Sequence, residues 1–369
     1  MIISESNDVY NGGDGRLGIL TRLSSPEQVE AYQSYRKERY RLQEIASGVL
    51  GDRRLAGCCK SVISLQQQVD ILRNAESGKC RYNGLMLCGS VWQCPVCAAR
   101  ITLQRKQELL TADLSGYHTG LLTFTISHGQ HDTLTSLLAD LSSMRNKLKS
   151  GKAWKQFRDN NAFTGAITTT EITHGGNGWH VHYHMLMIFE ALPNFEQLET
   201  HFYDRWSALA GKHGRYTSEA HGVDFRECEK LDYLTKWSTH SELVYGDRKD
   251  ARNGNISIWE MLRRIGEGDR QHEKHFREYA RCFKGKKQLV WGRGLKKLLS
   301  VGEEVPADQA VIELLMSLSR EDWQLILKHG KRAKILELAE EAGVSGVSAY
   351  FAFLSSFTST NKIASDFIK

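Results

Sequence analysis

Two strand-like stretches on either side of a short glycine-rich segment constrain the fold of this chain more than any other feature. Residues 162–173 and 179–189 are rich in Thr, Ile and aromatic side chains, and the five residues 174–178, His-Gly-Gly-Asn-Gly, lie between them. β-Branched and aromatic residues favour strands, and a Gly-rich connection of this length is typical of a hairpin. We therefore expect two antiparallel, hydrogen-bonded strands.

The residues around this hairpin alternate between strand-like and helix-like patterns. The expected elements are a strand at 120–127, a helix at 132–149, the two hairpin strands, a helix at 194–210, a strand at 222–226 and a helix at 229–237. The order β-α-β-β-α-β-α predicts an α+β fold with a central antiparallel sheet and helices against one face. Its plan is ferredoxin-like or RNA-recognition-motif-like.

Length and composition narrow the class of protein. The chain has 369 residues, of which 41% are hydrophobic, so it can bury a large core. Its longest apolar runs are far shorter than the roughly 18 residues of a membrane-spanning helix. The first residues lack the basic start and apolar stretch of a signal peptide, so we expect a cytoplasmic protein with no membrane partner. The 49 Lys and Arg against 43 Asp and Glu, a charge of +6, permit a polyanionic partner without requiring one.

Three histidines alternate along the second hairpin strand. Side chains at every second position of a strand share a face, so His180, His182 and His184 are expected on one side of the sheet. Glu171 lies three residues before the connection, and antiparallel pairing returns it to the histidines. Two imidazoles and a carboxylate can bind a divalent transition metal and leave it open to polarise a phosphate oxygen. The alternative is a polar sheet face in which hydrogen bonds satisfy the histidines.

The helix expected at 229–237 presents a possible nucleophile. Glu229, Tyr233 and Lys236 are spaced to share one face of a helix. A metal or an ammonium group nearby favours the phenolate of Tyr233, which can attack phosphorus and form a phosphotyrosine. Lys236 can hold the phosphate, and Glu229 can activate water or a hydroxyl in a later step. An ordinary amphipathic surface helix is the alternative.

Six of the eight cysteines fall within 55–97, a stretch that we expect to be an irregular small module. Cys88, Cys94 and Cys97 supply three thiolates, and the Cys-Pro-Val-Cys segment is a common zinc-knuckle turn. Spacing alone favours Cys80 as the fourth ligand. Cysteines of a reducing compartment are more often metal ligands or buried thiols than disulfides. Cys228 and Cys282 lie apart from the cluster and are expected to be ordinary thiols.

The His strand followed by a helical Tyr-x-x-Lys resembles the HUH endonucleases, in which a bulky hydrophobic residue separates two histidines. Within them the chain is most similar to replication initiator (Rep) proteins of rolling-circle plasmids and phages. The resemblance covers roughly residues 50 to 300. It depends on three further stretches: Tyr82-Asn-Gly-Leu-Met-Leu-Cys-Gly-Ser-Val-Trp-Gln-Cys-Pro-Val-Cys97, Trp179-His-Val-His-Tyr-His-Met185 and Lys284-Gly-Lys-Lys-Gln-Leu-Val-Trp-Gly-Arg-Gly-Leu295.

This resemblance implies residue roles. The metal ligands would be His182, His184 and Glu171, with Mn²⁺ or Mg²⁺ as cofactor and the pair His180 and His182 as an alternative. The nucleophile would be Tyr233 with Lys236 as its phosphate partner. Glu229 stands where some relatives keep a second tyrosine, which indicates the single-tyrosine type. A structural zinc would be held by Cys88, Cys94, Cys97 and Cys58. Gly292 departs from the family pattern, which has Ser there.

The segment 281–297 has seven Lys or Arg residues and no acid. It can grip backbone phosphates and stack a base. The candidate DNA-binding residues are Lys284, Lys286, Lys287, Trp291, Arg293, Lys296 and Lys297.

We divide the chain into an N-terminal helical segment (1–50), a zinc-binding module (51–112), an HUH endonuclease domain (113–245), a basic DNA-binding extension (246–300) and a helical C-terminal region (301–369).

The resulting expectation is an enzyme that starts rolling-circle replication. It would nick one strand of origin DNA, remain joined to the 5′ phosphate through Tyr233, free a 3′-OH for a polymerase, and later rejoin the strand. Its partners would be the origin, single-stranded at the nick, and a host helicase and polymerase. The alternatives are a rolling-circle transposase with the same chemistry, or a zinc-dependent DNA-binding regulator without catalysis.

Overall fold

The computed structural model describes residues 25–65, 67–228, 254–301 and 312–366. These residues form two compact units: unit 1 comprises Met1–Gly89 and Val305–Lys369, and unit 2 comprises Ser90–Glu304. The two segments of unit 1 are distant in sequence and contribute strands to one sheet. The division of the chain into five domains, which we expect from the sequence, remains a prediction.

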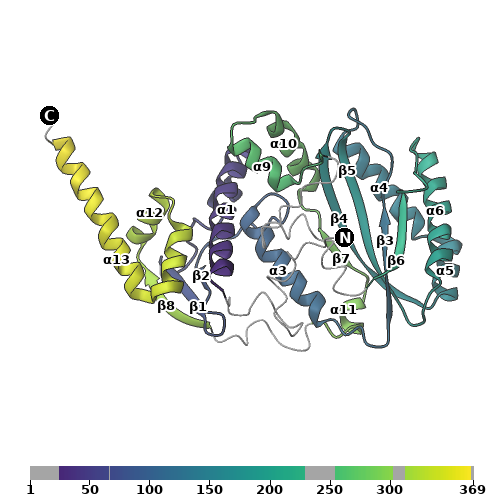
Figure 1. Ribbon diagram of the computed structural model, residues 1–369, viewed down its shortest axis with the longest axis horizontal. Helices are drawn as coiled ribbons and strands as arrows, with labels where there is room; N and C mark the ends of the chain where they lie inside the picture. The colour runs from purple at the N-terminus through teal and green to yellow at the C-terminus, as the bar shows by residue number, and fades with distance from the viewer. Residues whose placement is uncertain (1–24, 66, 229–253, 302–311, 367–369) are drawn as a thin grey trace, which may run out of the picture. The chain divides into compact units, whose positions relative to one another are not determined.

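Unit 1 contains an antiparallel sheet in the order β2-β1-β8. Its elements are α1 (Pro26–Leu50), α2 (Arg53–Gly57), β1 (Val69–Asn74), β2 (Cys80–Asn83), β8 (Ile312–Leu318), α12 (Arg320–Lys328) and α13 (Arg332–Asp366). Val69 and Ile71 of the central strand are fully buried with Trp323 and Ile335 of the two C-terminal helices. Figure 1 shows α13 bent, and its backbone is non-helical at Gly343, where φ is 60°.

Two expectations for this unit were wrong. The stretch 55–97 is not simply irregular, because it contains β1 and β2, and the region 301–369 is not purely helical, because it contains β8. Leu and Met in β8 have helical propensity, but pairing with β1 from Val69↔Leu318 to Asn74↔Ile312 overrides it. Local sequence carries no signal of a partner so far away.

Charged contacts join the first helix of unit 1 to its last. Arg36 of α1 is 3% exposed and forms an ion pair of 2.5 Å with Glu340 of α13. Arg332 is also buried and reaches Glu44 at 2.6 Å. A buried guanidinium that loses its carboxylate is strongly destabilising, so both pairs help to fix α1 against α13.

Unit 2 is built on a five-stranded antiparallel sheet in the order β6-β3-β5-β4-β7 (Figure 1). The strands are β3 (His118–Phe124), β4 (Phe163–Gly175), β5 (Gly178–Phe189), β6 (Val223–Glu227) and β7 (Leu289–Trp291). The α+β class and the antiparallel sheet expected from the sequence are confirmed. The helices of this unit are α3 (Pro95–Thr111), α4 (Leu134–Leu148), α5 (Gly151–Asn160), α6 (Phe195–Lys212), α9 (Ile258–Gly266), α10 (Gln271–Phe283) and α11 (Leu295–Leu298).

The hairpin connection is shorter than expected. Gly175 pairs with Gly178, so Gly176 and Asn177 alone connect β4 to β5. His174 also exchanges two backbone hydrogen bonds with Ile256, of 3.1 and 2.8 Å, which extends the strand beyond the five-residue loop that the sequence indicated. Gly178 has φ of 82°, and a Cβ there would lie 2.8 Å from the carbonyl oxygen of Gly129, so the turn requires glycine at this position.

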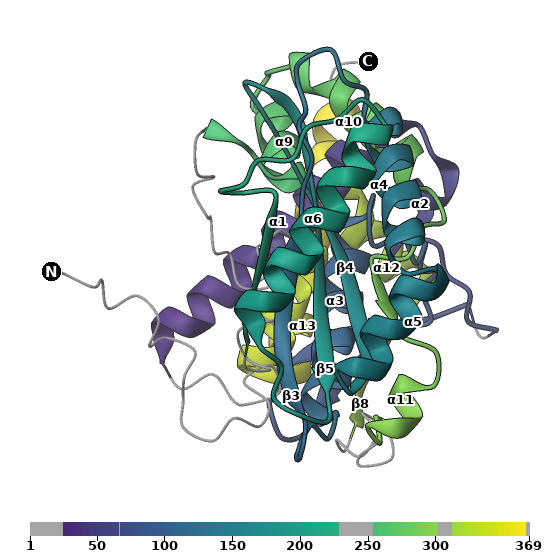
Figure 2. The ribbon, with the colours of Figure 1, turned by 90° about the vertical axis from the view of Figure 1, so that its right-hand side faces the viewer.

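Helices lie against both faces of this sheet. In Figure 2, α6 stands in front of the strands, and Phe124 of β3 stacks on Trp206 of α6 with ring centroids 4.4 Å apart. On the opposite face, Leu109 of α3 and Leu295 of α11 pack in one cluster with Leu186 of β5. The expectation of helices on one face was therefore wrong, because the pattern that suggested it did not include α3 or α11.

The other helices and strands expected within 118–228 agree with the structure to within a few residues, whereas six elements of unit 2 were not predicted: α3, α5, α9, α10, α11 and β7. The helix expected at 229–237 lies outside the described residues. Within the part of the chain that is described, no helix has the length and apolar character needed to cross a bilayer.

Candidate metal site and its surroundings

Strand register brings the expected metal ligands together. Glu171 of β4 pairs directly with His182 of β5, and the ligand atoms of Glu171, His182 and His184 all lie within 4.8 Å of one another. Nε2 of His184 lies 2.9 Å from Oε2 of Glu171. Ligands bound to one ion at about 2.1 Å and at right angles to each other are about 3 Å apart, so this spacing suits a shared cation.

A threonine on the neighbouring strand orients His184. Thr123 of β3 pairs with His184, and its Oγ1 lies 3.0 Å from Nδ1 of the imidazole. His184 is 5% exposed, so packing also restricts its ring. A metal-binding histidine usually has its second nitrogen held in this way, which leaves Nε2 directed at the ion.

His180 adjoins the group from the other side. Its Nε2 lies 2.6 Å from Nε2 of His182 and 3.4 Å from Oγ1 of Thr125. Burial, with the neighbouring His180 second, lowers the pKa of His182 to about 3. Burial and the proximity of His128 lower the pKa of His180 to about 4. Both rings are therefore neutral near pH 7 and have lone pairs for a cation.

The structure brings Glu171, His182 and His184 into one group, with His180 beside His182. The residues expected to supply the nucleophile and its helpers, Tyr233, Lys236 and Glu229, lie outside the described residues.

The expected zinc ligands occur as two local pairs. In unit 1, the backbone N–H of Cys88 donates to Sγ of Cys58 at 3.3 Å. In unit 2, Cys94 caps α3, and its Sγ accepts from the N–H of Cys97 at 3.5 Å. N–H donors and a helix N-terminus favour the thiolate over the thiol. All four cysteines are buried, and cysteine thiolates are common ligands of a structural zinc.

Cys80 is the alternative fourth ligand. It lies in β2, where its N–H donates to the Glu340 carboxylate at 2.7 Å. Burial raises the pKa of its thiol to about 11, the opposite of what a thiolate ligand requires. Cys228 packs in the core cluster of unit 2, and Cys282 contacts Oγ1 of Thr135 at 3.2 Å.

The basic segment has an exposed rim and a packed centre. The side chains that are exposed are Lys284, Lys286, Lys287, Arg293, Lys296 and Lys297. Trp291 instead lies in β7 and packs against the core cluster, with the Lys296 ammonium 5.5 Å from its ring centroid. Its ring therefore has less free surface for a base than the sequence suggested. At Gly292 a Cβ would lie 3.2 Å from the Ala166 carbonyl oxygen, so a side chain there would make a tight contact with β4.

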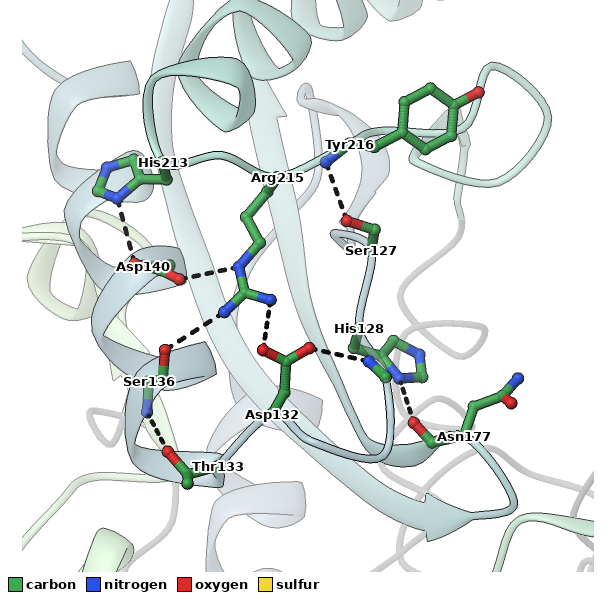
Figure 3. A network of polar contacts seen from close by, with 11 residues as sticks. Ser127, His128, Asp132, Thr133, Ser136, Asp140, Asn177, His213, Arg215 and Tyr216 are labelled. Carbon is green, nitrogen blue, oxygen red and sulfur yellow. Dashed lines mark hydrogen bonds and ion pairs between the residues drawn. The ribbon is translucent and has the colours of Figure 1, made fainter.

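A polar network beside the histidines was not predicted from the sequence (Figure 3). Arg215, after α6, binds Asp132 at 2.6 Å and Asp140 at 2.9 Å, and Tyr216 follows it. Burial opposes ionisation of Asp132, but hydrogen bonds from Arg215 and Gly129 lower the pKa of this carboxyl. The partners of Arg215 are 75 to 83 residues away in the sequence, so local sequence patterns do not reveal them.

The threonines that support the histidines could have been found from the sequence, because Thr123 and Thr125 repeat at period two on the adjacent strand.

Comparison with known proteins gives two relatives. The chain is 27% identical over 319 residues to a protein named "Protein rep" from Streptomyces lividans, covering 66% of this chain and 70% of that protein. It is 31% identical over 134 residues to a "Neomycin resistance protein" from Streptomyces cyanogenus, covering 28% of this chain and 31% of that protein. No family model and no solved structure matches the chain.

Proposed function

We propose that this chain is an HUH-type replication initiator of the single-tyrosine class, which nicks one strand of a rolling-circle origin and later rejoins it. The observation that carries the proposal is the grouping of Glu171, His182 and His184 on adjacent strands of one antiparallel sheet. The similarity to a Rep protein supports a role in plasmid replication.

The donor set suits a hard or borderline divalent cation such as Mn²⁺ or Mg²⁺. One carboxylate oxygen and two imidazole nitrogens converge, and the group of described residues contains no fourth protein ligand. When bound, such an ion polarises a non-bridging oxygen of the scissile phosphate. Thr123 keeps His184 in the orientation that this requires.

The nucleophile in this proposal is the phenol oxygen of Tyr233. It forms a bond to phosphorus while the bond from phosphorus to the 3′ oxygen breaks, and the departing oxygen takes up a proton to become the 3′-OH primer. Lys236 neutralises the phosphate held on Tyr233. Glu229 accepts a proton from the second nucleophile when the strand is rejoined or released.

The other proposed parts bind DNA or support the nuclease. Cys58, Cys88, Cys94 and Cys97 hold one structural zinc in the module at 51–112, and the exposed cations of 281–297 contact backbone phosphates. A host helicase and a polymerase would act on the product, which offers a free 3′-OH on an opened duplex.

The decisive experiment is incubation with single-stranded oligonucleotides spanning candidate origins, with Mn²⁺, followed by denaturing electrophoresis. A labelled band that migrates with the protein supports a covalent nicking enzyme, and the Tyr233→Phe variant is the matched control. DNA binding without such a band would favour the non-catalytic regulator. A rolling-circle transposase would form the same adduct, but its adduct would form on transposon ends and not on a plasmid origin.

A further inference from the structure

A pocket of about 280 Å³ opens next to the metal-ligand group in unit 2. Its walls come from residues 125–128 after β3, from Asn177 in the hairpin turn, from His180 of β5 and from Tyr216 after α6. Small-molecule sites in proteins measure roughly 300–1,000 Å³, so this one suits a single heterocycle better than anything larger.

One wall combines a fixed backbone with an exposed aromatic ring. The N–H of Ser127 donates to the carbonyl of Tyr216 at 2.8 Å, and the N–H of Tyr216 donates to the Ser127 hydroxyl at 2.9 Å. The preceding residue, Arg215, is anchored to two aspartates. Tyr216 nevertheless remains 68% exposed, and Figure 3 shows its ring extending away from the Arg215 network. A tyrosine held in this manner is a platform for stacking.

Other residues that line the pocket offer hydrogen-bonding groups. Nδ1 of His128 donates to the carbonyl of Asn177 at 3.1 Å, and the His128 ring stacks on His180 with centroids 4.6 Å apart. The second ring nitrogen of a histidine bonded in this way is a further hydrogen-bonding group. The Asn177 amide and the Ser127 hydroxyl add donors and acceptors, as the edge of a nucleobase requires.

The pocket and the metal-ligand group share a wall. His180 lines the pocket, and its Nε2 is 2.6 Å from Nε2 of His182 in the ligand group. None of the described residues lining the pocket carries a carboxylate, so a strand that enters it meets no negative side chain there. A phosphate at the metal site therefore has an uncharged, polar and partly aromatic pocket beside it.

We propose that this pocket binds one unpaired base of single-stranded DNA next to the scissile phosphate, with the base stacked on Tyr216. The proposal rests on the proposed nicking function, because that function places a phosphate at the metal-ligand group. A base in duplex DNA cannot enter, since its faces are covered by its neighbours. The pocket thus adds a requirement for unpaired DNA to the chemistry of the metal site.

The test compares two probes that differ only in their bases. A fluorescein-labelled oligothymidylate of about 12 nucleotides and an abasic strand of equal length are titrated with the full chain without added Mn²⁺ or Mg²⁺, where no nicking occurs. Loss of one stacked base lowers affinity roughly 5- to 150-fold. Tyr216→Ala should weaken oligothymidylate binding by a factor in this range and leave abasic binding unchanged, whereas Tyr216→Phe retains the preference.

Leu192→Ala is the matched control, because Leu192 is 64% exposed in the same unit and lies outside the pocket. An equal preference for bases in the parent and in Tyr216→Ala overturns the proposal. Photocrosslinking to an oligonucleotide with 5-iodouracil gives an independent reading, with Tyr216 as the expected crosslinked residue. Both binding measurements are made without added Mn²⁺ or Mg²⁺, so they do not depend on nicking. A base preference at Tyr216 in a protein that fails to nick DNA with Mn²⁺ would contradict the proposed function alone. Nicking with Mn²⁺ but without a base preference at Tyr216 would contradict the pocket alone.

Discussion

Nε2 of His184 and Oε2 of Glu171 lie 2.9 Å apart, although 13 residues separate them in the chain. The two-residue hairpin turn determines this distance, because a shift of one residue in strand pairing would move one partner to the other face of the sheet. The geometry of the site therefore depends on the register between β4 and β5.

His184→Ala should abolish Mn²⁺-dependent nicking and lower Mn²⁺ affinity at least about tenfold, because a ligand of the ion is lost. Glu171→Ala should weaken binding in the same way. Isothermal titration calorimetry with Mn²⁺ measures both effects. Unchanged affinity in His184→Ala would instead favour His180 and His182 as the metal pair.

Thr123→Val should lower metal affinity about 10- to 100-fold while the protein stays folded, because the hydroxyl that orients His184 is removed. Thr119→Val is the matched control: Thr119 lies on the same strand but donates to the Cys228 carbonyl. If both variants bind Mn²⁺ like the parent, Thr123 has no positioning role.

Tyr233→Phe should eliminate the covalent protein–DNA band and leave DNA affinity within about twofold, because only the nucleophilic oxygen is lost. Gel analysis of the adduct and fluorescence anisotropy measure the two properties. Full nicking by the variant would assign the nucleophile to another tyrosine.

Cys97→Ser should reduce bound zinc from about one ion per chain and lower the midpoint of thermal unfolding, since a structural zinc contributes directly to folding. Cys80→Ser is the matched control, because burial raises the pKa of the Cys80 thiol and so disfavours the thiolate that a zinc ligand supplies. Mass spectrometry of the metal content decides between them. If the Cys80 variant loses its zinc and the Cys97 variant retains it, Cys80 is the zinc ligand and Cys97 is not.

The free energy of unfolding should fall as the pH decreases from about 6.5 to 4. Burial, followed by the nearby His275 and His272, lowers the pKa of His174 from 6.5 to about 4. Below pH 6.5 the unfolded chain binds a proton that folded His174 does not, so acid favours unfolding until the folded pKa is reached. One such group contributes at most about 1.4 kcal/mol per pH unit, and less after solvent screening. Urea titrations across this range should give a flatter pH dependence for His174→Gln, and equal slopes would contradict the assignment.

Local periodicity was enough to predict the centre of the site but not its surroundings. Alternation in β5 and a Gly-rich turn predicted that Glu171 would meet the histidines, because hairpin pairing follows from adjacent sequence. The pairing of His174 with Ile256 depends on a segment that is distant in the sequence. The same holds for the ion pair of Arg215 with Asp132, which places Tyr216 beside the pocket. Contacts across long separations depend on the whole fold and leave no short-range pattern.

The pairing of β1 with β8 has a consequence for the order in which the chain folds. Asp70 of β1 accepts a hydrogen bond from Ser317 of β8, 247 residues later, so the sheet of unit 1 cannot be completed until nearly all of unit 2 has left the ribosome. Contacts this distant in sequence form slowly, whereas the β4–β5 hairpin can form as soon as it is synthesised. Until β8 arrives, one edge of β1 is open to other strands. A truncated product lacking β8 should therefore keep the folded sheet of unit 2 but aggregate through unit 1. The time spent in that incomplete state increases when translation slows.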